Sequence, residues 1–473
     1  MRILLTGATG YIGKRLLPVL LDLGHEVICC VRDVNRFTPP DNNNGKIKLI
    51  QVDLLDKKTL SKIPKDIDAA YYLVHSMSVS AKYQKLEHSS AVNFKNYLNK
   101  TNVKHVIYLS GIVNETILSE HLSSRKNVED ELSKGNYEYT VLRAGIIVGS
   151  GSASFEIIRD LVEKLPIMVT PKWLNTKCQP IGVSDVILFL TRSLLNEKLY
   201  GINFDIGGPE VLTYKEMLLE FAKVRNLKRK IFIVPVMTPR LSSYWLYFVT
   251  STSYNLAIAL VDSMKIEVIC RNDDLNKILN IEPLNYRESL LRAFNRIDNK
   301  VIISSWKDAY ASSAISSKIS DYAEVPSFGC FEEKKVKTIN DRERCINKIW
   351  SIGGRNGWYY ANTLWRLRGF IDKLAGGVGL RRGRTNDNNI NVGDALDFWR
   401  VIYADKEEGR LLLFAEMKLP GEAWLEFKIV GDELLQTATF RPLGLTGRLY
   451  WYTFLPFHEF IFQGMIDNIV SEN

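Results

Sequence analysis

A short apolar run followed by three regularly spaced glycines is the feature that most limits how this chain can fold. Residues 2–5 form the apolar run, the sequence TGATGYIG occupies 6–13, and a helical pattern follows. In such a unit Gly7 permits a tight turn, Gly10 lets the backbone approach a pyrophosphate, and Gly13 lets the helix pack closely on the strand. The N–H groups of the helix N-terminus then face the anion, and an ordinary glycine turn is the weaker interpretation. The predicted contacts in this loop are Thr6, Gly7, Thr9, Gly10, Tyr11, Ile12 and Gly13.

Residues 1–150 continue as alternating strands and helices. Strands are predicted at 2–5, 26–31, 47–52, 69–74, 105–109 and 139–143, and helices at 14–23 and 83–99. The strands are apolar without clean alternation, which indicates a parallel sheet with helices on both faces. The predicted fold class is therefore α/β, a doubly wound Rossmann-type sheet. From 143 to 296 the pattern loosens, and helices at 183–195 and 214–224 fit inserted segments that face a substrate.

A chain of 473 residues exceeds a single hydrophobic core, so a second domain is expected. A polar, serine-rich stretch at 304–337 marks the junction and divides the chain into domains 1–300 and 301–473. The second domain is predicted as α+β and helix-grip-like, with Pro456 at the start of its last helix. Its predicted strands are 395–403, 409–419, 423–430 and 433–441, and its predicted helices are 341–350, 452–470 and an amphipathic helix at 362–375 with a solvated basic face.

The composition of the chain narrows the classes of function that it could have. Hydrophobic residues make up 46% and charged residues 24% of the chain, which excludes a disordered or coiled-coil protein. The net charge of +9 suits an anionic cofactor but is too small for a nucleic-acid-binding surface. The six cysteines show no C-x-x-C spacing, so neither a metal site nor a disulfide framework is expected. Reduced thiols in a cytoplasmic protein are the simpler interpretation.

One uncharged stretch, 242–261, approaches the length of a membrane span. Its polar centre at 250–253 would be costly in hydrocarbon, so two short helices packed on a domain are the better interpretation. No transmembrane segment and no signal peptide are therefore expected, while peripheral membrane contact stays an open alternative. The sequence does not indicate an oligomeric state.

The ends of the second and third predicted strands carry polar residues that fit the rest of a dinucleotide. Arg32 follows the second strand, and an arginine there accommodates a 2′-phosphate. This favours NADP, with NAD as the alternative because Asp33 lies beside Arg32. Asp53 and Leu54 follow the third strand and are candidates for holding the adenine amino group, although Asp53 equally fits a helix N-cap.

The glycine loop resembles the cofactor loop of extended and atypical short-chain dehydrogenases/reductases, the group that includes nucleotide-sugar epimerases and NmrA-like proteins. The similarity covers about residues 1–295 and extends to Arg-Ala-Gly at 143–145 and to QPIGVSDV at 179–186. It implies that His75 and Ser76, at the end of the fourth strand, meet the nicotinamide ribose and ring. Ligands do bind at strand ends of parallel sheets, although His75 equally fits a core histidine.

Ser110, in Leu-Ser-Gly after the fifth strand, matches the catalytic serine of that group. The group then uses Tyr-x-x-x-Lys on the next helix, where the tyrosine transfers a proton and the lysine lowers its pKa and holds the ribose. This chain has His121-Leu-Ser-Ser-Arg125 instead. Arg125 retains a positive charge for ribose contacts, and His121 is a candidate proton relay, although a surface histidine is at least as good an interpretation.

The C-terminal segments 444–452 and 456–458 resemble a bacterial family of uncharacterised domains that follow a short-chain dehydrogenase/reductase half. That family is similar to the START/polyketide-cyclase (SRPBCC) superfamily, whose cavity holds apolar ligands. The resemblance implies a small apolar ligand or substrate for the C-terminal domain. Trp451 and His458 equally fit packing residues.

Three functions are consistent with these residues. The first is an NADP(H)-dependent oxidoreductase that acts on a small, fairly apolar carbonyl or enone, with Ser110 polarising the oxygen. The second is an NADP(H)-binding sensor or assembly factor without turnover, which the missing Tyr and Lys support. A nucleotide-sugar epimerase or dehydratase is the weakest, because such enzymes use the absent pair.

Overall fold

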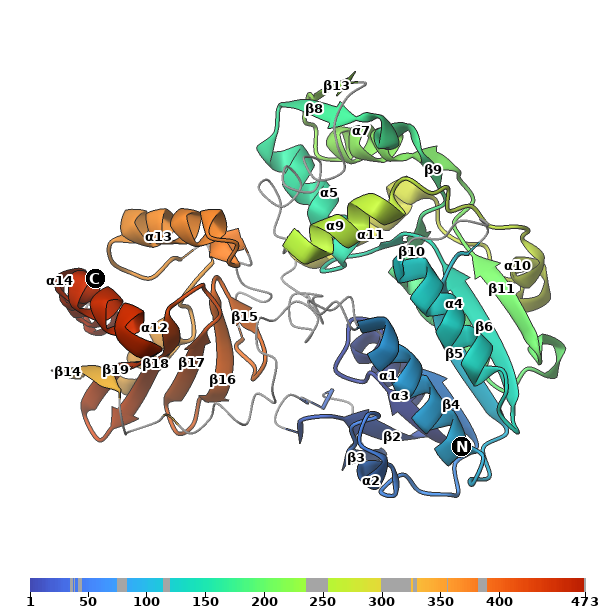
Figure 1. Cartoon of the computed structure of the whole chain (residues 1–473), viewed down its shortest axis with the longest axis horizontal. Coiled ribbons are helices and arrows are strands. Elements are labelled where there is room, and N and C mark those ends of the chain that lie inside the picture. Colours follow the sequence, from blue (N-terminus) through green and yellow to red (C-terminus); the bar gives the residue numbers. More distant parts are fainter. Residues whose placement is uncertain are drawn as a thin grey trace. The chain divides into compact units, whose positions relative to one another are not determined.

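The computed structural model describes residues 1–34, 37, 39–40, 45–74, 83–113, 120–234, 254–298, 325, 330–354, 356–381 and 389–471. A few of these residues, mostly in helices, are described by their backbone alone. The chain divides into two compact units, Met1–Ser312 and Ser313–Asn473, and each has its own hydrophobic core (Figure 1).

A seven-stranded parallel sheet forms the centre of the N-terminal unit. Its strand order is β11-β6-β5-β4-β1-β2-β3 (Figure 1). The strands are β1 (Arg2–Thr6), β2 (Glu26–Val31), β3 (Ile47–Gln51), β4 (Ala69–Tyr72), β5 (His105–Gly111), β6 (Glu138–Ala144) and β11 (Ile202–Ile206). The strand order reverses between β1 and β4, and in such sheets ligands bind outside the carboxyl ends of the strands at this point. The predicted doubly wound α/β class is confirmed.

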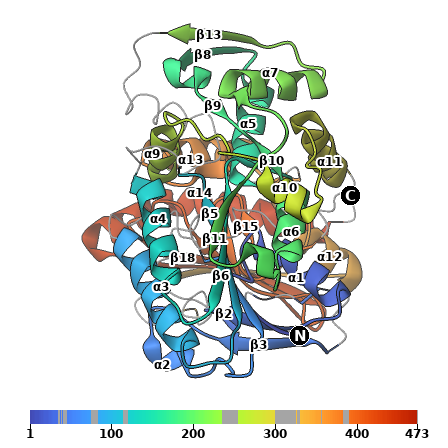
Figure 2. The same ribbon diagram turned by 90° about the vertical axis from the view of Figure 1, so that its right-hand side faces the viewer.

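Alternate side chains of the strands pack against helices on opposite faces of the sheet. One core includes Ile3 and Leu5 and the other includes Leu4, so β1 contributes to both. Figure 2 shows α3 and α4 on one side of the strands and α1 and α6 on the other. Because both faces are buried, these strands are continuous apolar runs in the sequence. The first core contains α1 (Gly13–Asp22), α6 (Val183–Arg192) and α10 (Asp274–Leu279), and the second contains α2 (Lys57–Leu60), α3 (Tyr83–Leu98) and α4 (Glu120–Leu132).

The segments inserted after β6 form a third hydrophobic cluster. It contains α5 (Ala153–Lys164), α7 (Tyr214–Val224), α9 (Tyr254–Ser263) and α11 (Tyr286–Asp298). Three short strand pairs accompany these helices: β7 (Ile147–Val148) with β10 (Ile181–Gly182), β8 (Ile167–Pro171) with β13 (Lys230–Val234), and β9 (Lys177–Cys178) with β12 (Leu212–Thr213). Helices α6 and α7 confirm two of the helices predicted in this region.

The C-terminal unit is built on a six-stranded antiparallel sheet in the described residues, with the order β14-β19-β18-β17-β16-β15. The long helix α14 packs against β14 and β19, and the predicted α+β class is confirmed. The strands are β14 (Phe331–Thr338), β15 (Ala395–Leu396), β16 (Trp399–Asp405), β17 (Arg410–Ala415), β18 (Gly421–Val430) and β19 (Glu433–Pro442), and the helices are α12 (Arg342–Ile349), α13 (Asn362–Leu374) and α14 (Gly444–Val470).

One prediction for this unit is wrong, and one of its strands was not predicted. The strand β14 lies at the end of the polar stretch 304–337, and β19 supplies a backbone with which Phe331–Thr338 pairs along its whole length. Pro456 lies inside α14 and not at its start, because α14 begins at Gly444 and not at the predicted position 452. The helix begins earlier because Trp451 stacks between Phe331 and Phe440, with interplanar angles of 6° and 7°. Aromatic packing outweighs the backbone hydrogen bond that the proline loses.

Helix α13 confirms the helix predicted at 362–375. Its Trp365 is buried, whereas Leu367, Phe370 and Leu374 are 53%, 49% and 62% exposed. Among the described residues, the helix therefore buries Trp365 and leaves three other apolar side chains partly exposed.

Within the described residues, no helix has both the length and the apolar character that crossing a membrane requires. Helix α9 covers the last part of the uncharged stretch at 242–261, and the rest of that stretch lies outside the described residues.

Candidate cofactor-binding and catalytic site

The glycine loop joins β1 to α1 with little room for side chains. Gly7 has a φ of +71°, and a Cβ there would lie 2.7 Å from the Leu73 carbonyl oxygen. A Cβ on Gly10 would lie 3.1 Å from the Gly7 carbonyl oxygen, and a Cβ on Gly13 would lie 2.9 Å from Ala8 Cα. Helix α1 has no side-chain cap and no acidic residue in its first turn. A helix N-terminus of this kind, reached through a loop without side chains, suits an anion such as a pyrophosphate.

Two side chains of the loop make internal hydrogen bonds. The Thr6 hydroxyl donates to the Tyr71 carbonyl oxygen at 2.9 Å and accepts from the Leu73 N–H at 3.2 Å, which ties β1 to the end of β4. The Tyr11 hydroxyl donates to the Ser150 carbonyl oxygen at 3.3 Å. Both side chains therefore shape the loop, and its backbone is what remains to face a cofactor.

Arg32 and Asp33 follow β2 and differ in exposure. Arg32 is exposed, and its carbonyl oxygen accepts a hydrogen bond from the Gln51 side chain at 3.1 Å. The neighbouring Asp33 is only 3% exposed. The guanidinium is therefore the charged group that a cofactor phosphate can reach at this strand end.

Asp53 and Leu54 lie in the turn after β3. One carboxylate oxygen of Asp53 accepts from the Leu55 N–H at 3.0 Å, so Asp53 closes its own turn. The N-cap of α2 is Asp56, and the alternative interpretation of Asp53 as a helix N-cap is wrong. The Leu54 side chain is buried in the core, and its carbonyl oxygen accepts from the Asn93 amide at 2.9 Å.

Ser110 lies at the carboxyl end of β5 and is 4% exposed. Its hydroxyl makes no well-aligned hydrogen bond among the residues that the structure describes, although the Tyr108 side chain lies beside it. Arg125 of α4 donates to the Leu109 carbonyl oxygen at 3.2 Å, which places its guanidinium beside this strand end. Arg125 Nε is also buried and unpartnered within the described part of the chain. The structure therefore brings two of the predicted catalytic residues together, and each has an unused donor.

Tyr108 belongs to the same group, although no sequence motif points to it. It precedes Ser110 by two positions on β5, so both side chains lie on the face of the sheet that α3 and α4 cover. Burial raises the pKa of Tyr108, while the nearby Arg125 and Ser110 oppose that shift. The two-residue period of the strand is the signal that could have identified Tyr108.

Buried polar contacts fix helix α4, and with it Arg125. The Ser124 hydroxyl donates to the Glu87 carboxylate of α3. Arg143 of β6, in the Arg-Ala-Gly segment, pairs with Glu129 of α4 at 2.5 Å, and both side chains are almost fully buried. Arg143 therefore holds α4 against the sheet.

Three of the predicted site residues cannot be placed. His75 and Ser76 lie outside the described residues, and of His121 only the backbone, within α4, is described. Their roles stay predictions. In the part of the chain that the structure describes, no three His, Cys, Asp or Glu side chains gather as a metal site would require.

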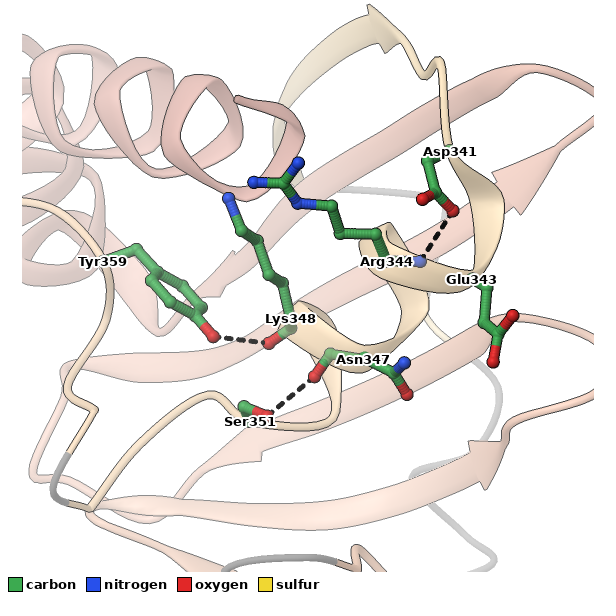
Figure 3. A pocket seen from close by; sticks show the side chains of 7 residues that line it. All are labelled: Asp341, Glu343, Arg344, Asn347, Lys348, Ser351 and Tyr359. Atoms are coloured by element: carbon green, nitrogen blue, oxygen red, sulfur yellow. Dashed lines mark hydrogen bonds between the residues drawn. The ribbon is translucent and has the colours of Figure 1, made fainter. Parts of the chain in front are cut away.

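A polar hollow of about 480 Å³ beside α12 is a second concave site (Figure 3). The Arg344 N–H donates to Asp341 at 2.9 Å, and the Tyr359 hydroxyl donates to the Lys348 carbonyl oxygen at 2.9 Å. The Lys348 ammonium donates to the Ser471 carbonyl oxygen at 2.7 Å, just beyond α14. These bonds connect α12 with its neighbours, so a structural role accounts for this hollow.

Two protein families match the chain. Residues 7–163 match the family described as NAD(P)H-binding, and residues 330–465 match the family described as Protein of unknown function (DUF2867). The similarity of the C-terminal domain to the START/polyketide-cyclase superfamily finds no support in these matches and stays a prediction.

Two curated relatives each match about half of the chain. The chain is 22% identical over 255 residues to divinyl chlorophyllide a 8-vinyl-reductase, chloroplastic, from Arabidopsis thaliana, a match that covers 50% of this chain and 60% of that protein. It is 24% identical over 245 residues to photosystem II assembly factor Ycf39 from Trieres chinensis, which covers 51% of this chain and 75% of that protein. The chain thus spans 60% of the length of the reductase.

A solved structure with the same fold is triphenylmethane reductase from Citrobacter sp., with a TM-score of 0.52 and 18% identity. The match covers 62% of this chain and 100% of the reductase, which has also been solved with NADP(H). At this identity the likeness shows the fold. Together with the matched families, it shows that an NAD(P)H-binding Rossmann domain is followed in this chain by a C-terminal domain of a family whose function is unknown.

Proposed function

We propose that the N-terminal domain is an NADPH-dependent oxidoreductase that acts on a small, fairly apolar carbonyl or enone compound. The observation that carries the proposal is the buried Ser110 hydroxyl at the carboxyl edge of the sheet, which makes no well-aligned hydrogen bond among the described residues and lies beside Tyr108. Leaving a buried hydroxyl without a partner costs roughly 1–3 kcal/mol. A substrate oxygen would offset this cost by accepting a hydrogen bond from Ser110.

The glycine loop and Arg32 support NADPH as the cofactor. The backbone around Gly7 and Gly10 suits the pyrophosphate, because a Cβ at either position would meet backbone atoms. Arg32 is exposed where the 2′-phosphate of NADPH would lie, whereas Asp33, the residue that would favour NADH, is buried.

Bound NADPH would supply a hydride to the carbonyl carbon, or to the β-carbon of an enone. Ser110 would hold the substrate oxygen, and the Arg125 guanidinium would stabilise the negative charge that develops there. Tyr108, whose pKa burial raises, stays protonated at neutral pH and supports proton donation through Ser110. Ser110, Arg125 and Tyr108 would together take the roles of the Tyr and Lys pair that this chain lacks.

A second candidate is an NADPH-binding sensor or assembly factor without turnover. The specific observation in its favour is that His121 and Arg125 stand where a Tyr-Lys pair is expected. One curated relative bears the name of an assembly factor, and both candidates predict NADPH binding.

Oxidation of NADPH, measured with a panel of quinones, aldehydes and enones, separates the two candidates. Ser110→Ala should lower activity about 100-fold, the effect of removing one oxyanion donor, and leave NADPH affinity unchanged. Ser193→Ala is the matched control, because Ser193 is also a buried serine with an unpartnered hydroxyl among the described residues. Silence across the panel with normal NADPH binding would favour the sensor, and equal activity of both variants would exclude the role of Ser110.

A further inference from the structure

An apolar cavity lies in the C-terminal domain between the sheet and helices α13 and α14. Its volume is about 260 Å³, and most of its lining is aromatic or aliphatic. Arg368 is the one charged side chain among the described lining residues, and its guanidinium donates to the Lys418 carbonyl oxygen at 3.1 Å. The cavity therefore suits an apolar ligand and offers few contacts to a charged ligand.

Two indole N–H groups at this cavity lack partners. Trp365 of α13 and Trp399 of β16 both line it, and the Nε1 atom of each is buried without a hydrogen-bond partner in the described part of the chain. The neighbouring Trp358 shows the usual arrangement, because its Nε1 donates to the Asp397 carboxylate at 2.8 Å. The rings of Trp365 and Trp399 both pack on Trp358, with centroid distances of 5.3 and 6.1 Å. The lining of one apolar cavity thus includes two indole donors that are unused among the described residues.

His458 of α14 adds a neutral polar group to the same lining. Its ring lies 5.4 Å from Trp451 and 5.7 Å from Phe462, and its Nδ1 has no partner among described residues. Burial, with a contribution from Arg368, lowers the pKa of His458 to about 4. The imidazole is therefore uncharged at neutral pH.

The mouth of the cavity is apolar as well. Leu367 and Ile371 of α13 and Phe457 of α14 line the cavity, yet they are 53%, 50% and 54% exposed. Side chains that line the cavity and are also exposed to solvent mark where a ligand enters. Exposed apolar groups at an opening of this kind are typical of a ligand-binding cleft.

We propose that this cavity binds an apolar small molecule that carries a carbonyl or similar hydrogen-bond acceptor, and that the Trp365 and Trp399 indoles donate to that acceptor. The site is separate from the proposed reduction, because binding here needs neither NADPH nor Ser110.

Benzophenone and diphenylmethane form a matched pair of probes, because they differ only in a carbonyl in place of a methylene. Calorimetry on the full chain without NADPH should show tighter binding of benzophenone. Trp365→Phe and Trp399→Phe keep the ring packing and should each weaken benzophenone binding roughly two- to tenfold, the effect of one hydrogen bond. Diphenylmethane binding should not change in either variant.

Trp173→Phe is the matched control, because Trp173 in the N-terminal unit also has an unpartnered indole N–H among the described residues. Under irradiation benzophenone attaches to neighbouring C–H bonds, and the labelled peptides should come from α13 and α14. Thermal unfolding confirms that each variant is folded. Four outcomes would each overturn the proposal. They are equal affinity for both probes, no saturable binding of either probe, labelling of peptides elsewhere, and an unchanged benzophenone affinity in both folded cavity variants.

Discussion

Replacing Gly13 by alanine tests the close contact between α1 and the glycine loop. The new Cβ would overlap the Gly7 carbonyl oxygen and lie 2.9 Å from Ala8 Cα, whereas carbon atoms pack best at about 3.5–4.0 Å, so α1 must move by roughly 1 Å or more. Such overpacking costs about 1–3 kcal/mol of folding free energy. The shift also moves the first-turn N–H groups, and losing one charge-assisted hydrogen bond to the pyrophosphate should raise the Kd for NADPH about 10- to 150-fold.

Calorimetric titration with NADPH measures this effect, and Gly24→Ala is the control. Gly24 follows the other end of α1 with a φ of +85°, and the nearest atom to a Cβ there would be Lys46 Nζ at 4.0 Å. A side chain in this left-handed conformation costs about 1–2 kcal/mol, so the control loses comparable stability without touching the loop. NADPH affinity should therefore fall in Gly13→Ala alone. Equal affinities of Gly13→Ala and the unaltered protein would refute the reasoning.

Three further predictions concern the cofactor, helix α4 and pH. Arg32→Ser removes the exposed guanidinium, so fluorescence titration should show an NADPH Kd at least about tenfold higher and an almost unchanged NADH Kd. Equal losses of affinity for NADPH and NADH would contradict this. Glu129→Gln leaves Arg143 buried without its charged partner and should cost about 3–5 kcal/mol in urea unfolding, whereas a loss below about 1 kcal/mol would argue against it. His105 is fully buried, its Nδ1 accepts from the Leu195 N–H at 3.1 Å, and burial lowers its pKa to about 4. Because the unfolded imidazole titrates near about 6.5, stability should be complete above that pH and should fall by about 2 kcal/mol between pH 6.5 and 5. Thermal unfolding should show this slope flattened in His105→Gln, and an unchanged slope would disprove the assignment.

The N-terminal fold was predictable because its signals are local. Gly7, Gly10 and Gly13 act through backbone conformation and contacts within their own loop, and each strand is a short apolar run bounded by polar residues. The catalytic group was predictable only in part. Ser110 and Arg125 occupy positions that the sequence order suggests, whereas Tyr108 joins them because the pleat of β5 turns Tyr108 and Ser110 to the same face.

The C-terminal domain was harder to predict because its elements depend on distant partners. The strand Phe331–Thr338 is rich in Lys and Glu and resembles a linker, and it becomes a strand only because β19 pairs with it. Helix α14 includes Pro456 because Trp451 stacks on rings from β14 and β19. Neither interaction leaves a local trace in the sequence.

The sequence by itself determined the dinucleotide-binding unit and the alternation of strands and helices along the chain, because glycine spacing and apolar runs restrict the backbone directly. Only the tertiary structure decided which buried polar atoms are left without partners. Ser110, Trp365 and Trp399 look ordinary in the sequence, and they become candidates for ligand contacts because the described segments around them bury their polar atoms without a well-aligned hydrogen bond.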